Sequence, residues 1–176
     1  MFALVFTDIV DSTTLANELH DEKWIDVLLK HFTQARGLME SYDHHEIKII
    51  GDSFMVVFRD VLDALDFTIA LKEETGDDRI KIRAGIHVGP ARIIGDVFGI
   101  MVNYTKRVES TENPLSIRLS DFARKQIADE GAQRHAHLKF RSIRLSFKGF
   151  PELQTVWVAF DPRWAFSKSI RNRIRI

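Results

Sequence analysis

The sequence lacks cysteine, which excludes disulfide bonds, thiol catalysis and zinc–cysteine sites. It also lacks an excess of either charge, because Lys plus Arg and Asp plus Glu each number 25. This balance gives no indication of nucleic-acid binding, so we expect no nucleic-acid partner. No apolar run approaches the roughly 20 residues of a transmembrane helix, and Asp8 and Asp11 interrupt the N-terminal apolar run that a targeting peptide would need. These absences predict a cytoplasmic protein without a membrane span.

Apolar residues make up 45% of the 176 residues, which is enough for one folded domain with a core. We expect that domain to cover residues 1–162. The tail over 163–176 alternates basic and apolar residues, as in segments that touch an anionic membrane or a partner, but a solvated terminus is the commoner explanation. The first expected strand begins at the start of the chain, so we expect any regulatory domain or protein to lie outside it.

The hydrophobic pattern predicts an α+β fold with a ferredoxin-like βαββαβ core, the arrangement also found in polymerase palms. The expected elements are a strand over 2–7, a helix over 12–42 with a break before Asp21, a hairpin over 46–58, a helix over 60–75 and a strand over 80–88 that continues over 91–94. A C-terminal αβαββ extension follows. It comprises a helix over 99–111, a strand over 115–119, a helix capped by Ser120 to about residue 127, and a closing hairpin from 137–148 and 153–160.

Two carboxylates stand where apolar strands end. Asp8 follows the expected buried strand, and Asp52 lies in the bend Gly51-Asp52-Ser53 of the expected hairpin. Asp52 alone is more often a plain turn residue than a ligand. If the two strands are neighbours, both carboxylates meet near the N-terminus of the following helix, which attracts phosphate. Such a pair suits a nucleoside triphosphate with Mg²⁺, because Mg²⁺ binds carboxylate and phosphate oxygens together.

At residues 6–13 and 48–55 the sequence resembles the two metal motifs of the class III nucleotidyl cyclases. Three further segments continue the resemblance in the family's order. They are Arg83-Ala84-Gly85-Ile86-His87-Val88-Gly89, the D-x-[WF]-G-x-x-V-N-x-x-x-R signature over 96–107, and Lys148-Gly149. Each motif is weak alone, but together they cover roughly residues 2–160 and make the chain similar to that family.

The resemblance implies a two-metal reaction in which the 3′-hydroxyl of a nucleoside triphosphate attacks its own α-phosphate and releases pyrophosphate. It implies that Asp8, Asp52 and the backbone carbonyl of Ile9 bind two divalent cations, Mg²⁺ or Mn²⁺. Asn103 would orient the ribose, and Arg107 would meet the α-phosphate. Their spacing of four positions allows both to share one face of a helix.

The same resemblance assigns residues that would bind the terminal phosphates and residues that would bind the base. Arg83 and Lys148 match the residues that hold the terminal phosphates, and Lys48 with Asp96 matches the pair that favours adenine. The implied function is therefore an adenylate cyclase that converts ATP to 3′,5′-cyclic AMP. A cyclase using GTP or a pyrimidine nucleotide stays open. A catalytically silent domain that binds nucleotide or a partner also stays open.

The resemblance further implies a homodimer, because in this family each active site lies between two subunits. One subunit gives the metal ligands and Arg83, and the other gives the remaining residues, which are Lys48, Asp96, Asn103, Arg107 and Lys148. This chain carries both sets, so an isologous pair of sites is expected.

Two features need a separate interpretation. Asp11 departs from the glycine that is common at its place in the family. Either it caps the following helix or its charge weakens phosphate binding, and we prefer the interpretation as a cap. The close histidine pairs are interpreted as surface or loop residues, because no third metal ligand is evident near either pair. The pairs are His44-His45 and His135 with His137. His87 is interpreted as structural, because it lies in the strand that matches the family.

Overall fold

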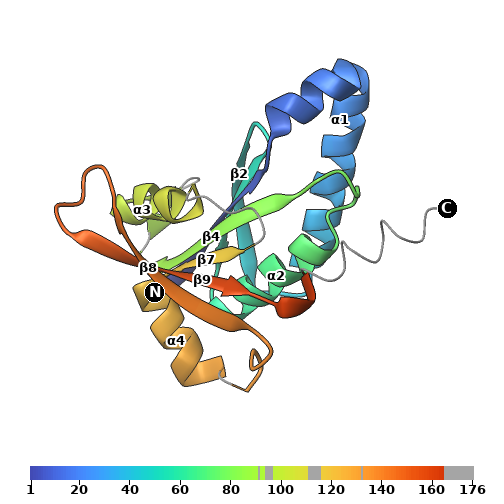
Figure 1. Cartoon of the computed structure of the whole chain (residues 1–176). Coiled ribbons are helices and arrows are strands. Elements are labelled where there is room, and N and C mark those ends of the chain that lie inside the picture. The colour runs from blue at the N-terminus through green and yellow to red at the C-terminus, as the bar shows by residue number, and fades with distance from the viewer. Residues whose placement is uncertain (91, 94–96, 111–115, 132, 165–176) are drawn as a thin grey trace.

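A computed structural model gives the structure of the chain and describes residues 1–90, 92–93, 97–110, 116–131 and 133–164 (Figure 1). The elements are β1 (Phe2–Ile9), α1 (Ser12–Met39), β2 (His44–Ile50), β3 (Ser53–Phe58), α2 (Val61–Glu73), β4 (Ile82–Gly89), β5 (Arg92–Ile93), β6 (Val97–Phe98), α3 (Ile100–Glu109), β7 (Ile117–Ser120), α4 (Asp121–Gly131), β8 (Lys139–Ser146) and β9 (Leu153–Phe160). The expected α+β fold is confirmed: the βαββαβ core is followed by the αβαββ extension, with β5 and β6 between them.

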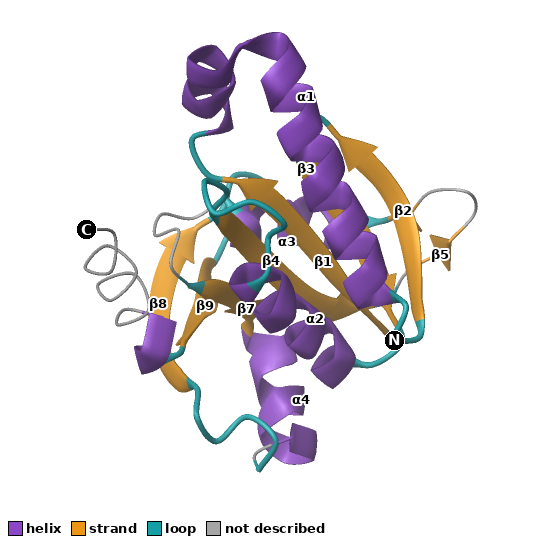
Figure 2. Ribbon diagram, turned by 90° about the vertical axis from the view of Figure 1, so that its right-hand side faces the viewer, coloured by secondary structure: helices purple, strands orange, loops and turns teal. Residues whose placement is uncertain are grey.

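A central sheet joins both parts of the chain. Its strands follow the order β2-β3-β1-β4-β7-β9-β8, and β5 pairs with β6 in a separate small sheet. Figure 2 shows α1, α2 and α4 on one side of the large sheet, with α3 behind it. The hydrophobic core agrees with this arrangement, because Val5 packs with α1, α2 and α4, whereas Leu4 and Phe6 pack with Met101 of α3.

Strand β1 lies in the interior of the sheet and is buried on both faces from Ala3 to Ile9. This explains its continuous apolar run, since a strand covered on both sides shows no alternation of apolar and polar residues. Side chains still alternate between the faces, so Asp8 lies on the same side as Leu4 and Phe6. The strand therefore places the first candidate acid on the face covered by α3.

Local geometry confirms two expectations and corrects a third. His20 has non-helical angles inside α1 (φ 62°, ψ 161°), which is the break expected before Asp21. The Ala123 N–H donates to Ser120 Oγ at 3.2 Å, so the expected cap of α4 forms. The expected capping role of Asp11 is wrong, because its side chain makes no capping hydrogen bond. Its backbone is left-handed (φ 55°), a conformation that glycine adopts most readily.

Other differences concern the ends of elements. α1 ends at Met39 rather than near 42, and β4 begins at Ile82 rather than at 80. Arg92–Ile93 pairs with Val97–Phe98 instead of extending β4, while residues 91 and 94–96 lie outside the described part of the chain. Among the described helices, none combines the length and the apolar character needed to cross a bilayer.

Candidate active site

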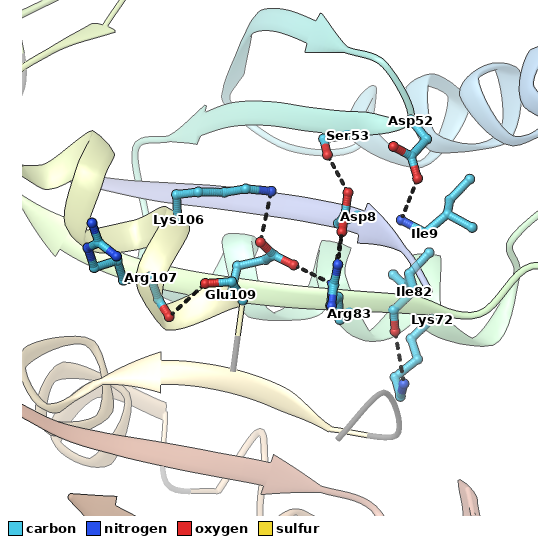
Figure 3. Close-up of polar contacts among 11 residues, drawn as sticks. Asp8, Ile9, Asp52, Ser53, Lys72, Ile82, Arg83, Lys106, Arg107 and Glu109 are labelled. Atoms are coloured by element: carbon cyan, nitrogen blue, oxygen red, sulfur yellow. Dashed lines mark hydrogen bonds and ion pairs between the residues drawn. The ribbon is translucent and has the colours of Figure 1, made fainter. Parts of the chain in front are cut away.

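The two candidate acids lie at one end of the central sheet (Figure 3). The register of β1 with β4 places Asp8 directly opposite Arg83. From β3, the Ser53 hydroxyl donates to Asp8 Oδ1 at 2.5 Å. The backbone N–H of Ile9 donates to Asp52 Oδ2 at 3.3 Å, which fixes the second carboxylate beside the first strand. We call this end the acidic edge; it comprises Asp8, Ile9, Asp52, Ser53 and Arg83.

A tight turn delivers Asp52 to the acidic edge. Ile50 pairs with Ser53, so Gly51 and Asp52 form a two-residue hairpin turn. Gly51 has a φ of 64°, which suits the turn types that match the twist of a hairpin. Asp52 is therefore a turn residue and also a neighbour of Asp8. From the sequence, a turn residue and a metal ligand were competing interpretations of Asp52. The fold makes the two compatible.

Asp8 is held in its ionised form. Its side chain is largely buried, and both Arg83 Nε, at 2.8 Å, and an Arg83 terminal nitrogen donate to Asp8 Oδ2. Burial disfavours the charge, but the hydrogen bonds from Ser53 and Arg83 outweigh it and lower the pKa of Asp8 below its usual value. The carboxylate is thus charged at neutral pH, as a cation ligand must be.

Two residues that the sequence analysis missed extend this network. Glu109, the last residue of α3, has Oε1 2.8 Å from Arg83 Nε and Oε2 2.9 Å from Lys106 Nζ. Burial raises the pKa of Glu109, against the effect of Lys106. Periodicity carried a signal for it, since Glu109 lies on the buried face of α3 with Met101 and Thr105.

Asn103 and Arg107 lie elsewhere on α3. The buried residues of this helix face the sheet, whereas Asn103 is exposed and Arg107 is half-buried. Figure 3 shows the Arg107 side chain directed away from the acidic edge, while the neighbouring Lys106 points toward it. Within one protomer, therefore, the fold does not bring Asn103 and Arg107 to the two acids.

Lys148 lies at the opposite end of the sheet. Strand β7 runs parallel to β4, and β9 runs antiparallel to β7. The β8–β9 turn that carries Lys148 consequently lies beyond the end of β4 at Gly89, whereas Arg83 lies near its beginning. The side chain of Lys148 is exposed. The two expected phosphate-binding residues are thus separated by the length of the strands.

The expected base-reading pair is only half described. Lys48 lies on β2, at the edge of the sheet, opposite Met55 of β3, which in turn lies opposite Phe6 of β1. It is therefore two strands from β1 and on the α3 side of the sheet, because directly opposed residues share a face. Asp96 lies outside the described residues.

The acidic edge has the donor atoms for a divalent cation that binds together with phosphate. Asp8 and Asp52 offer carboxylate oxygens, which hard cations prefer. Within the described ranges, no three His, Cys, Asp or Glu side chains gather into a metal cage. A cation at this edge would hence complete its coordination with backbone, water or phosphate oxygens, as Mg²⁺ does with nucleotides. The start of α1 at Ser12, shortly after Ile9, adds backbone N–H groups that favour anions.

Comparison with known proteins identifies the family and supports the fold. Residues 1–158 match the family model described as "Adenylate and Guanylate cyclase catalytic domain". The crystal structure of the adenylyl cyclase CyaB from P. aeruginosa superposes with a TM-score of 0.77 at 22% sequence identity, covering 92% of this chain and 94% of that one. At this identity the superposition demonstrates the shared fold.

Curated relatives include a receptor and a subunit of a guanylate cyclase. Atrial natriuretic peptide receptor 2 from Anguilla japonica is 27% identical over 179 aligned positions, which cover 88% of this chain but 17% of the receptor. Guanylate cyclase soluble subunit beta-2 from Rattus norvegicus is 29% identical over 151 positions, covering 73% of this chain and 22% of the subunit. The chain therefore spans about a fifth of the length of these relatives.

Proposed function

The chain belongs to the adenylate and guanylate cyclase catalytic domain family, and on that premise we propose that it converts ATP to 3′,5′-cyclic AMP and pyrophosphate. The observation that carries the proposal is the meeting of Asp8 and Asp52 at the acidic edge, linked through Ile9 and Ser53. A carboxylate on a buried strand and a second one in the adjoining hairpin turn form the half-site that a metal-bound triphosphate needs.

In the proposed reaction the 3′-oxygen of the ribose forms a bond to the α-phosphorus, and the bond from that phosphorus to the β-phosphate oxygen breaks. The proton of the 3′-hydroxyl passes to water, and pyrophosphate leaves with the electron pair. Divalent cations, when bound at Asp8, Asp52 and the Ile9 carbonyl, would stabilise the charge on the attacking and leaving oxygens. Mg²⁺ and Mn²⁺ both suit these oxygen donors.

The remaining roles fall to side chains that lie apart from one another within one protomer. Arg83 would hold a terminal phosphate beside the acids. Asn103 would orient the ribose for in-line attack, and Arg107 would neutralise charge developing on the α-phosphate. Lys148 would hold the leaving pyrophosphate, because a lysine ammonium is a compact charge suited to phosphate.

A second copy of the chain supplies the missing half in this proposal. Asn103 and Lys148 are exposed and lie away from the acidic edge of their own protomer. A two-fold axis that places α3 and the β8–β9 turn of one copy over the acidic edge of the other would complete two equivalent sites. The active species is then a homodimer, and activity per chain rises with protein concentration.

Adenine is the proposed base because Lys48 and Asp96 can donate to N1 and accept from the 6-amino group. GTP is the competing substrate, since one curated relative described above is a guanylate cyclase subunit. The two substrates differ in the hydrogen-bonding pattern of one ring edge, so a small set of polar residues decides between them.

A product assay tests the proposal. Purified protein is incubated separately with ATP, GTP, CTP and UTP, with Mg²⁺ or Mn²⁺, and the products are identified by mass spectrometry. We expect cyclic AMP from ATP, at a specific activity that rises with protein concentration. Cyclic GMP as the main product would overturn the assignment of the base and keep the cyclase mechanism. No cyclic product across a wide range of protein concentration would instead favour the catalytically silent domain.

A further inference from the structure

Glu109 is a buried acid in an unfavourable place. Its side chain is 0% exposed, and it forms the C-terminal residue of α3. The C-terminal end of a helix carries partial negative charge, so a carboxylate there is destabilised by the helix dipole as well as by burial. A hydrophobic residue would avoid both effects, so the contacts of Glu109 indicate what its carboxylate does.

Those contacts connect Glu109 to the acidic edge. Arg83 Nε lies 2.8 Å from Glu109 Oε1 and 2.8 Å from Asp8 Oδ2, so one guanidinium is held between two carboxylates (Figure 3). Lys106 Nζ lies 2.9 Å from the other oxygen of Glu109 and over the Phe6 ring at 5.7 Å. Each carboxylate oxygen of Glu109 thus faces a cation.

The main chain fixes Glu109 in this place. A Cβ built on Gly85 of β4 would lie 2.4 Å from the backbone nitrogen of Glu109, which is too close for any side chain. Glycine at this position lets the end of α3 rest directly on the strand that carries Arg83. The carboxylate is consequently positioned by the backbone of two elements rather than by a flexible surface segment.

We propose that Glu109 is a positioning residue for Arg83, which it holds beside the acidic edge when the Asp8 carboxylate is taken by a divalent cation. This inference rests on the proposed function. Arg83 and a cation compete for the same oxygen of Asp8, so Arg83 must release that oxygen when a metal-bound triphosphate arrives. Glu109 then remains as the anchor that keeps the guanidinium at the edge and directed toward a terminal phosphate.

The role gives two measurable consequences for Glu109→Gln. Without its anchor, Arg83 binds the triphosphate less well, so we expect KM for the nucleotide to rise about tenfold while kcat falls less. Arg83 also relies wholly on Asp8 in the variant and competes harder with the cation. The Mn²⁺ concentration for half-maximal activity should therefore rise severalfold, which loss of folded protein alone would not cause.

Calorimetric binding of pyrophosphate with Mg²⁺ gives a readout that needs no turnover. We expect Glu109→Gln to weaken this binding about tenfold. In an Arg83→Ala background the same change should have almost no further effect, because Glu109 is proposed to act through Arg83. Additive losses in the two backgrounds would overturn the proposal, as would unchanged pyrophosphate binding and unchanged Mn²⁺ dependence in a folded Glu109→Gln protein.

Asp66→Asn is the matched control. Asp66 also pairs with an arginine, Arg134, but it lies on α2, across the sheet from α3. Its substitution should leave pyrophosphate binding unchanged. If Glu109→Gln does not fold, Glu109→Asp keeps the charge and withdraws the carboxylate by one methylene, and the same measurements decide. A wild-type protein without cyclase activity that still binds pyrophosphate through Arg83 and Glu109 would overturn the proposed function and leave this inference standing.

Discussion

The acidic edge and the outer surface of α3, which carries Asn103, hold their polar side chains in opposite ways. At the acidic edge, Asp8 contacts both Ser53 and Arg83, and it is largely buried. On the outer surface, Asn103 is exposed, and its position on the helix is fixed by the buried neighbouring residue Tyr104. At the acidic edge the polar side chains bond to one another, whereas the outer surface of α3 presents polar groups to the outside.

Aromatic packing holds the outer surface in register with the β8–β9 turn. The Tyr104 ring lies 5.4 Å from Phe147 and 5.1 Å from Phe150, both in edge-to-face contact. These contacts fix the exposed Lys148 relative to Asn103 without using either polar group. The comparison teaches that the two halves of the proposed active site are held by different means within one chain, as the proposed dimer requires.

The largest expected effect comes from breaking the acidic edge. Asp52→Ala should reduce turnover by about a thousandfold or more, because loss of a metal carboxylate removes several kcal/mol of transition-state stabilisation. Folding should change little, since Asp52 lies in a hairpin turn and not in the core. Cyclic nucleotide production and thermal unfolding measure the two effects.

Asp129→Ala serves as the control for Asp52→Ala, because Asp129 is exposed on α4, on the other side of the sheet. It should keep wild-type activity. Retained activity in Asp52→Ala with an unchanged cation requirement would contradict the metal-binding role of Asp52.

Complementation tests directly whether the two regions belong to different subunits. Asp52→Ala and Arg107→Ala should each be nearly inactive alone. In an equal mixture, half of randomly formed dimers are mixed, and each mixed dimer contains one intact site of two. Activity should thus recover to about a quarter of the wild-type value. The measurement is cyclic nucleotide formation after mixing and equilibration.

The mixture of Asp52→Ala with Asp8→Ala is the matched control, because both changes affect the same half-site and no mixed dimer gains an intact one. It should stay inactive. Recovery in neither mixture, from variants that still dimerise, would place both regions in the same site of one chain.

The choice of base should change by a smaller factor. Lys48→Glu combined with Asp96→Cys removes the proposed adenine contacts and should shift the ratio of kcat/KM for ATP over GTP by about ten- to a hundredfold toward GTP. The preference is measured with both nucleotides in competition. A ratio that does not move would mean that other residues read the base.

The smallest effect concerns His87, whose ring packs against that of Tyr104 at an interplanar angle of 43°, with ring centroids 4.6 Å apart. Burial lowers the pKa of His87 to about 4 from an ordinary value of 6.5. The unfolded chain therefore binds the proton first. Stability from this group is fully present above about pH 6.5 and is lost as the pH falls toward about 4, with an upper limit of about 3 kcal/mol.

His87→Phe should consequently flatten the pH dependence of the free energy of unfolding between about pH 6.5 and 4. Urea unfolding at several pH values measures the slope. His45→Phe, which changes an exposed residue of β2, should keep the wild-type slope. Equal slopes in the wild type and His87→Phe would contradict the assignment of this effect to His87.

Much of the fold could be predicted from local pattern. The apolar run before Asp8 predicts a buried strand, and the periodicity over α2 predicts an amphipathic helix. These predictions succeed because burial imposes a repeat on the chain itself. The predicted cap by Asp11 is wrong for a different reason: the residue type suits a cap, but the backbone at this position is left-handed and the side chain makes no capping hydrogen bond.

The sequence by itself determined the order of the elements, the family motifs and the residue types of both proposed half-sites, because these depend on side-chain chemistry and short-range spacing. The tertiary structure decided which of them meet. Strand register set Asp8 opposite Arg83. The packing of α3 against Gly85 placed Glu109 beside Arg83, although Glu109 lies 26 positions further along the chain. Antiparallel pairing put Lys148 at the far end of the sheet. Such long-range contacts arise from the packing of whole elements, and no local pattern in the chain encodes them.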